Sequence, residues 1–295
     1  MSTARADSIR TRLLNRARER GEDYNLLLTR YALERWLYRL SLSQHSLQFI
    51  LKGAMLFALW YDIPHRPTRD ADFLGVGPAD AESLRTALQA VCGIECDDGM
   101  NFQPDSVVVT EIRKEANYDG LRVTLMGLLG TARCPVQMDV GFGDAVTPKP
   151  EQAAYPVLLP ELPGPQLAVY PRTTVIAEKL EAIVSLGMRN SRMKDYFDLY
   201  VLLTDDTVDL SLLAQAIANT CQRRDTALPA ELPLGLDDAF ALDLSKQAQW
   251  NGFARKNKLS PPSLPTVISV IRTALERPMQ EARASLAALK PSLGT

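Results

Sequence analysis

Histidine and cysteine are scarce in this chain, and their scarcity narrows the chemistry available to it. Only two histidines, His45 and His65, occur among 295 residues, so a serine–histidine or cysteine–histidine nucleophile is poorly supported. Of the four cysteines, Cys92 and Cys96 are far in sequence from the other two, which disfavours a structural zinc site. The cysteines are better interpreted as buried thiols in a reducing compartment.

Long apolar runs are also missing. Lys52 interrupts the longest run before it could span a bilayer. The N-terminus has no apolar core of the signal-peptide type. We therefore expect a cytoplasmic protein that has no membrane partner.

The whole chain lacks a strong excess of charge of either sign. Its formal net charge is −2, which gives no general attraction to nucleic acid. Locally, residues 1–43 hold nine arginines, no lysine and five acidic residues, an excess of 9 − 5 = 4 positive charges. This excess is either a solvated helix face or an edge that binds RNA or a protein partner. It lies mostly on Arg10, Arg12, Arg16, Arg18 and Arg20.

The composition is that of a folded globular protein, with 46% hydrophobic and 23% charged residues. Apolar spacing predicts helices at 5–20, 23–41, 54–61 and 79–91, and strands at 47–51, 70–76, 107–113, 121–129 and 136–142. Prolines concentrated in 148–171 predict a linker or extended connection, and the helices predicted beyond it are 172–187, 192–204, 209–223 and 265–289. The order predicts an α+β fold, with N-terminal helices at 1–45 packing on the core, an α/β domain with a mixed sheet at 46–160 and a helical domain at 161–295.

Two carboxylates, Asp70 and Asp72, stand one residue apart at the start of a predicted strand. Residues i and i+2 of a strand point to the same side, with Cα atoms roughly 6.5–7 Å apart. Both side chains can therefore reach one hard cation, or a pair of cations about 3.5–4 Å apart. Two such carboxylates repel each other without a counter-charge, and a metal ion would resolve that conflict.

Asp139 is a third acid in an apolar strand pattern, where an acid is costly unless it is paired or bound to metal. It is either a further metal ligand, which the Asp pair favours, or an acid at the strand end hydrogen-bonded in the turn that follows. Lys52-Gly53 lies between a predicted strand and a helix, where glycine and a helix N-terminus suit a phosphate group. Thr68 offers a hydroxyl beside the Asp pair, or serves a turn.

The predicted helices of the C-terminal half add further charged residues. Lys179 faces an apolar stripe, so its ammonium group either snorkels to water or points into a cleft at phosphate. Lys194, Asp195 and Asp198 follow in one helix, where Lys194 and Asp198 are i,i+4 neighbours. A surface ion-pair ladder has similar spacing. The apolar neighbours of Asp198 favour instead a half-buried acid that orients a lysine or serves the site.

The ordered set of these motifs resembles the AbiEii/AbiGii-type nucleotidyltransferase toxins, including the Men-type toxins, of the DNA polymerase β-like nucleotidyltransferase superfamily. The resemblance covers about residues 50–200. Its most discriminating piece is the Lys-Asp-x-x-Asp-Leu helix. The matching segments are Leu51-Lys-Gly-Ala54, Arg66-Pro-Thr-Arg-Asp70-Ala-Asp72-Phe73, Met138-Asp-Val-Gly-Phe-Gly-Asp144, Glu178-Lys-Leu-Glu-Ala182 and Arg192-Met-Lys-Asp-Tyr-Phe-Asp-Leu199.

The resemblance implies a nucleotidyltransferase-like sheet domain and the transfer of a nucleoside monophosphate from an NTP. It implies that Asp70, Asp72 and Asp139 hold Mg²⁺ on the triphosphate and the acceptor hydroxyl. It also assigns Lys179 and Lys194 to the triphosphate charge, Asp195 or Asp198 to holding these lysines, and Lys52, Gly53 and Thr68 to the nucleotide site. The implied acceptor is the 3′ end of tRNA, and the nucleotides transferred to it are often pyrimidine nucleotides. The implied partner is an antitoxin, which sometimes phosphorylates a hydroxyl residue near the Asp pair, where this chain has Thr68.

Two alternatives remain beside a toxin that modifies tRNA. The same chemistry can act on a small molecule or a protein, in which case substrate binding would be insensitive to salt. A degenerate, catalytically weak member would bind nucleotide or a partner without turnover. Ala54 supports this second alternative, because it replaces the serine that usually follows glycine in the first motif of the superfamily.

Overall fold

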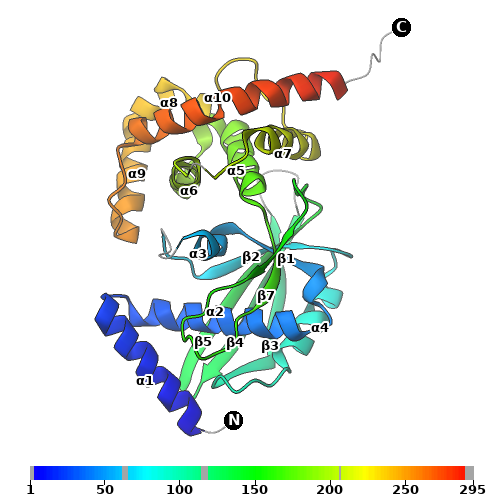
Figure 1. The fold of residues 1–295 in the computed structure, drawn as a ribbon, viewed down its shortest axis with the longest axis vertical. Coiled ribbons are helices and arrows are strands. Elements are labelled where there is room, and N and C mark those ends of the chain that lie inside the picture. Colours follow the sequence, from blue (N-terminus) through cyan, green and yellow to red (C-terminus); the bar gives the residue numbers. More distant parts are fainter. Residues whose placement is uncertain (1–2, 62–65, 114–118, 206, 290–295) are drawn as a thin grey trace. The chain divides into compact units, whose positions relative to one another are not determined.

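The computed structural model describes residues 3–61, 66–113, 119–205 and 207–289 (Figure 1). The chain divides into two compact units, each described here by itself. The first unit comprises Met1–Gly143 and Glu151–Val169, and the second comprises Asp144–Pro150 and Tyr170–Thr295. The three-part division into 1–45, 46–160 and 161–295 stays a prediction.

The first unit is built on a mixed seven-stranded sheet of order β3-β4-β5-β2-β1-β7-β6. The pairs β2–β5 and β1–β7 are parallel, and the other neighbours are antiparallel. The strands are β1 (Phe49–Lys52), β2 (Asp70–Gly75), β3 (Met100–Arg113), β4 (Asp119–Leu129), β5 (Ala132–Phe142), β6 (Glu151–Ala154) and β7 (Gln166–Val169). The helices are α1 (Thr3–Arg20), α2 (Tyr24–Leu42), α3 (Phe57–Trp60) and α4 (Ala81–Cys92), with 3₁₀ turns at Ser46–Gln48 and Gly53–Leu56.

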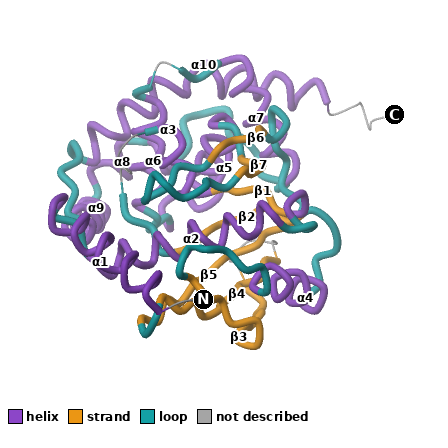
Figure 2. The backbone as a smooth tube through the Cα atoms, turned by 60° about the horizontal axis from the view of Figure 1, so that its bottom comes forward, coloured by secondary structure: helices purple, strands orange, loops and turns teal. Residues whose placement is uncertain are grey.

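The two faces of this sheet differ in polarity because side chains alternate along each strand. In β2, Ala71 and Phe73 are buried, whereas Asp70 and Asp72, which alternate with them, are only partly buried. Helix α2 packs against one face of the sheet (Figure 2). On this apolar face the Trp36 ring meets the Phe73 ring edge-on, with the ring centroids 6.1 Å apart. The two aspartates therefore project from the face opposite α2.

Of the two interpretations of the proline-rich segment 148–171, a linker or an extended connection, the structure contradicts the linker. This segment contributes two strands, and β7 pairs in parallel with β1 through Ile50 and Leu51. Its prolines lie outside both strands, so they remove no hydrogen bond from the ladder. The predicted helix 54–61 is also shorter, because a 3₁₀ turn precedes α3.

The second unit is helical among its described residues, as the sequence predicts for the C-terminal part. Its helices are α5 (Arg172–Leu186), α6 (Met193–Leu203), α7 (Leu210–Arg223), α8 (Asp238–Leu242), α9 (Leu244–Asn257) and α10 (Leu264–Leu289), with 3₁₀ turns at Gly187–Arg189 and Leu234–Leu236. Leu180, Ile217 and Leu275 are among its fully buried core residues. The α+β fold class is confirmed, whereas α8 and α9 were not predicted. In the described part of the chain, none of the helices has both the length and the apolar character needed to cross a bilayer.

Candidate functional site

A row of charged residues crosses the polar face of the sheet. Lys52 of β1 is the register partner of Asp72 in β2, and Asp72 is the partner of Asp139 in β5. Asp139 is in turn the partner of Arg122 in β4. Register partners project to the same face, and Asp70 joins them because it lies two residues before Asp72. The fold thus brings the three predicted carboxylates onto one face, although Asp139 is 67 residues from Asp72 in sequence.

Asp139 forms a bidentate ion pair with Arg122. Nε and Nη2 of the guanidinium group donate to Oδ1 and Oδ2 of Asp139, each at 2.8 Å. The Asp139 side chain is 16% exposed and that of Arg122 is 42% exposed. Asp139 lies inside β5, three residues before its end, so the strand-end turn interpretation is wrong. Arg122 was not predicted, because only the pairing of β4 with β5 reveals it.

All three carboxylates act electrostatically on this one guanidinium group. The hydrogen bonds from Arg122 to Asp139 raise the pKa of Arg122, and the charges of Asp139, Asp70 and Asp72 raise it further. Arg122 therefore stays protonated beside the acidic row.

Thr68 and Gly53 each approach one of the paired aspartates. The Thr68 hydroxyl donates to Oδ1 of Asp70 at 2.7 Å. Gly53 has a positive φ of 75°, and a Cβ atom placed there would lie 2.2 Å from Oδ2 of Asp72. Only glycine leaves room for the Asp72 carboxylate at this position.

The acidic row suits a divalent cation in its donor chemistry. Carboxylate oxygens are the ligands that Mg²⁺ prefers, and the three acids share the sheet face with Arg122 beside them. Among the residues that the structure describes, no three His, Cys, Asp or Glu side chains converge as a metal-binding group in the geometry seen. In this structure both carboxylate oxygens of Asp139 accept hydrogen bonds from Arg122 instead.

The second unit contains a buried ionic cluster around Lys179 of α5. Its Nζ lies 2.9 Å from Oδ1 of Asp195 and 2.7 Å from Oδ2 of Asp198, both in α6. Lys179 is 12% exposed, and the two acids are 3% and 0% exposed. The Lys179 side chain does not snorkel to water, and the two acids hold it.

The charge state of this cluster follows from its contacts. Burial would raise the pKa of the Asp195 carboxyl, but Lys179 and Arg192 outweigh burial and lower this pKa. Arg192 Nε lies 3.0 Å from Oδ2 of Asp195. Lys194 is exposed and forms no ion pair with the described residues, so Asp198 pairs with Lys179 and not with Lys194.

A second ionic cluster was not predicted from the sequence. Arg224, at the end of α7, lies 3.0 Å from Asp144, 3.3 Å from Glu178 and 2.7 Å from Glu181. Burial would lower the pKa of Arg224, but the three carboxylates raise it. All three acids occur in sequence motifs named above, and these motifs were the only feature of the sequence that could have pointed to the cluster. Arg224 therefore ties α5, α7 and the segment after β5 together within the second unit.

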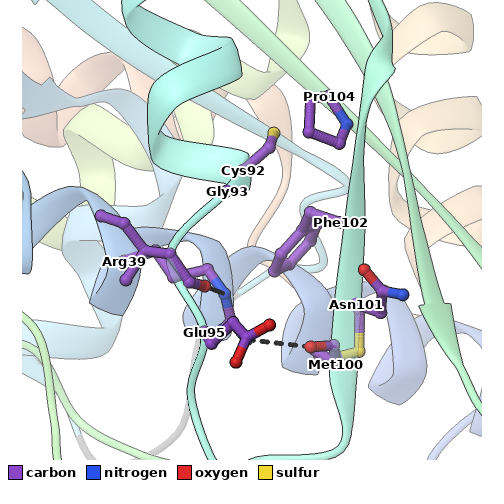
Figure 3. Close-up of a pocket in the computed structure, with 9 residues that line it drawn as sticks. Arg39, Cys92, Gly93, Glu95, Met100, Asn101, Phe102 and Pro104 are labelled. Carbon is purple, nitrogen blue, oxygen red and sulfur yellow. Dashed lines mark hydrogen bonds between the residues drawn. The ribbon is translucent and has the colours of Figure 1, made fainter. Parts of the chain in front are cut away.

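A cavity of about 190 Å³ lies on the other face of the sheet, and none of the predicted site residues line it (Figure 3). It is bordered by α2, α4 and β3 through residues that include Arg39, Cys92 and Phe102. All five N–H groups of Arg39 have partners there: the guanidinium group donates to both carboxylate oxygens of Asp98 and to three backbone carbonyl groups. We assign this cavity no part in the candidate site.

The chain is similar to one known protein family and to two solved structures. The family model described as the nucleotidyl transferase AbiEii toxin of a type IV toxin–antitoxin system matches residues 35–277. No curated protein sequence matches the chain significantly. Two solved structures from Helicobacter pylori are similar at a TM-score of 0.43. One, a candidate nucleotidyltransferase, is 16% identical and the match covers 87% of this chain and 94% of that one. The other, JHP933, is 15% identical with 88% and 92% covered.

Proposed function

Because the chain belongs to the AbiEii family of nucleotidyl transferase toxins of type IV toxin–antitoxin systems, we propose that it transfers a nucleoside monophosphate from an NTP to the 3′ acceptor end of tRNA. The preferred donor in this proposal is a pyrimidine NTP. Blocking the acceptor end prevents aminoacylation and so stops translation. A cognate antitoxin restrains the enzyme, and both act in the cytoplasm.

One observation carries the proposal. Asp72 and Asp139 are register partners on adjacent parallel strands, and Asp70 projects from the same face. In this proposal the three carboxylates hold Mg²⁺, with Asp139 exchanging its pairing to Arg122. The cation, when bound, lowers the pKa of the acceptor hydroxyl and neutralises charge on the triphosphate.

The remaining predicted residues have supporting parts in this proposal. Lys52 and Gly53 contact the phosphates, and Lys179 and Lys194 neutralise triphosphate charge. Asp195 and Asp198 support Lys179, in agreement with the short contacts of both acids to its ammonium group. Thr68 donates to Asp70, so a phosphate group on its oxygen would place like charge against the acidic row.

A different acceptor is the second candidate, and the contacts of α1 favour it. Arg12 pairs with Glu161, and Arg16 donates to the Leu158 carbonyl group, so these arginines fasten α1 to the segment between β6 and β7. Arg18 and Arg20 are exposed at the end of α1 and form no ion pair with the described residues. The basic N-terminus is thus partly used inside the fold, which weakens the argument for RNA.

The test incubates the protein with each α-³²P-labelled NTP, Mg²⁺ and total tRNA. We expect label on tRNA with one pyrimidine NTP, and none with Asp70→Ala or Asp72→Asn. Asp105→Asn, an exposed acid of β3, is the matched control and should transfer like the wild type. Label on another acceptor would favour the second candidate, and nucleotide binding without any labelled product would favour a catalytically weak member.

A further inference from the structure

Arg122 donates hydrogen bonds to both carboxylate oxygens of Asp139, which the proposed function assigns to a metal ion. We propose that Arg122 is an exchangeable counter-ion. It holds Asp139 when no metal and nucleotide are bound, and it passes to the triphosphate when a divalent cation takes Asp139. This inference rests on the proposed function and adds a residue that controls how metal and nucleotide bind.

The first step is competition for the same oxygens. Both Oδ atoms of Asp139 accept hydrogen bonds at 2.8 Å from one guanidinium group. Arginine stays protonated at any physiological pH, so this positive charge cannot be removed by losing a proton. A divalent cation at Asp139 therefore loses access to the oxygens and is repelled by a like charge as long as Arg122 stays in place.

The second step concerns where Arg122 goes. Its side chain is 42% exposed, whereas that of Asp139 is 16% exposed, so the arginine is the partner that can leave. A planar guanidinium group binds phosphate oxygens in the same forked manner as carboxylate oxygens. An NTP supplies those oxygens at the moment when the metal takes Asp139. The exchange replaces one charge-assisted pair with another, and no charge is left unpaired.

The third step is the thermodynamic consequence. If Arg122 must leave Asp139 for the metal to bind, and the triphosphate gives Arg122 a new partner, each ligand strengthens the binding of the other. Free metal alone is then bound weakly, and metal with nucleotide is bound tightly. An Arg122 that only stabilised the β4–β5 hairpin would leave just the coupling that arises from direct coordination of the cation by the triphosphate.

The experiment measures the dissociation constant of Mn²⁺, used as a spectroscopic substitute for Mg²⁺. It is measured without and with an NTP analogue that carries a methylene group between its α- and β-phosphates. Arg122→Gln should tighten binding of Mn²⁺ alone by about tenfold. It should reduce the strengthening by the analogue by about the same factor, because direct coordination of Mn²⁺ by the phosphates remains. Arg133→Gln is the matched control, because Arg133 is an exposed arginine on the same face of β5, roughly 20 Å from Asp139 along the strand. It should bind Mn²⁺ like the wild type.

Further variants make every outcome decisive. Arg122→Lys keeps the charge but loses the fork, so it should tighten binding of Mn²⁺ alone by a smaller factor, and it decides the matter if Arg122→Gln does not fold. If the wild type binds Mn²⁺ through Asp72, as Asp72→Asn would show, and neither Arg122 variant changes this affinity, the exchange is overturned and the proposed function stands. If no protein binds Mn²⁺ with or without the analogue, both are overturned.

Discussion

The carboxylate of Asp72 lies where a side chain at residue 53 would begin, and this space is open because residue 53 is glycine. A Cβ atom at Gly53 would lie 2.2 Å from Oδ2 and 2.9 Å from Cγ of Asp72. These atoms are far closer than any contact allows, so a side chain at residue 53 must displace the carboxylate. The glycine of the Lys-Gly motif thus serves the acidic row directly.

Gly53→Ala should therefore lower kcat/KM for nucleotidyl transfer by about 100-fold, the scale of a misplacement of about 1 Å in an active site. Gly21→Ala is a matched control, because Gly21 also has a positive φ, of 65°, but nothing lies within 4 Å of its added Cβ atom. Both variants carry backbone strain, and only the first should lose activity. Equal activity of the two variants would contradict this role of Gly53.

The hydrogen bond from Thr68 to Asp70 predicts a charge-sensitive position. Thr68→Glu places a carboxylate beside Asp70 and Asp72, and like charge there should lower kcat/KM by about 100-fold or more. Thr68→Val removes only the hydrogen bond and should cost about tenfold at most. Steady-state transfer assays compare the two variants. A valine variant as inactive as the glutamate variant would show that the hydroxyl itself, and not the charge, decides activity.

The cluster of Lys179, Asp195 and Asp198 predicts a large effect on stability. Lys179→Met leaves two buried acids without their ammonium partner and should lower the free energy of unfolding by about 3–5 kcal/mol. Lys194→Met changes an exposed lysine and should stay within about 0.5 kcal/mol of the wild type. Urea denaturation measures both. Equal midpoints for the two variants would show that the buried ion pairs contribute no net stability.

Glu34 predicts a pH dependence of stability in the first unit. Burial raises the pKa of its carboxyl group from 4.5 to about 7, against the opposing effects of Arg35 and the Leu158 N–H. Between these two pH values the folded state holds a proton that the unfolded state has lost. The contribution of Glu34 to the free energy of unfolding is therefore complete below pH 4.5 and is lost as the pH rises to about 7.

Urea denaturation between pH 4.5 and 8 tests this dependence. The free energy of unfolding of the wild type should fall by up to about 3 kcal/mol relative to Glu34→Gln over this range, and should fall no further above it. Glu82→Gln, an exposed acid of α4, should follow the wild type. Parallel curves for the wild type and Glu34→Gln would contradict the raised pKa.

The sequence predicted those parts of the fold that depend on local spacing. Alternating polarity placed Asp70 and Asp72 on one face of a strand, and apolar periodicity located α5, α6 and α7. Contacts across the chain could not be predicted in this way. The pairing of Arg122 with Asp139 depends on the register of a hairpin, and the approach of Gly53 to Asp72 depends on how a turn packs on a neighbouring strand.

The unpredicted strands have a similar explanation. Strand β7 is only four residues long and lies among prolines, so its propensity is weak, and its pairing with β1 across more than 100 residues makes it a strand. Likewise, the family resemblance implied that Asp195 or Asp198 holds a lysine, but the spacing within α6 could not show that both acids pair with Lys179, because this depends on how α5 and α6 pack together. Strand pairing and ion-pair partners that sequence patterns left open are therefore determined by tertiary packing.

Mass spectrometry of the 3′-terminal tRNA fragment, after incubation with the protein, Mg²⁺ and the NTPs, decides whether the acidic row transfers nucleotides to tRNA. We expect a mass gain of one or more nucleoside monophosphates with the wild type and with Asp105→Asn, and no gain with Asp72→Asn. An unchanged fragment with the wild type, or the same gain with Asp72→Asn, would contradict the claim that the acidic row carries out nucleotidyl transfer to tRNA.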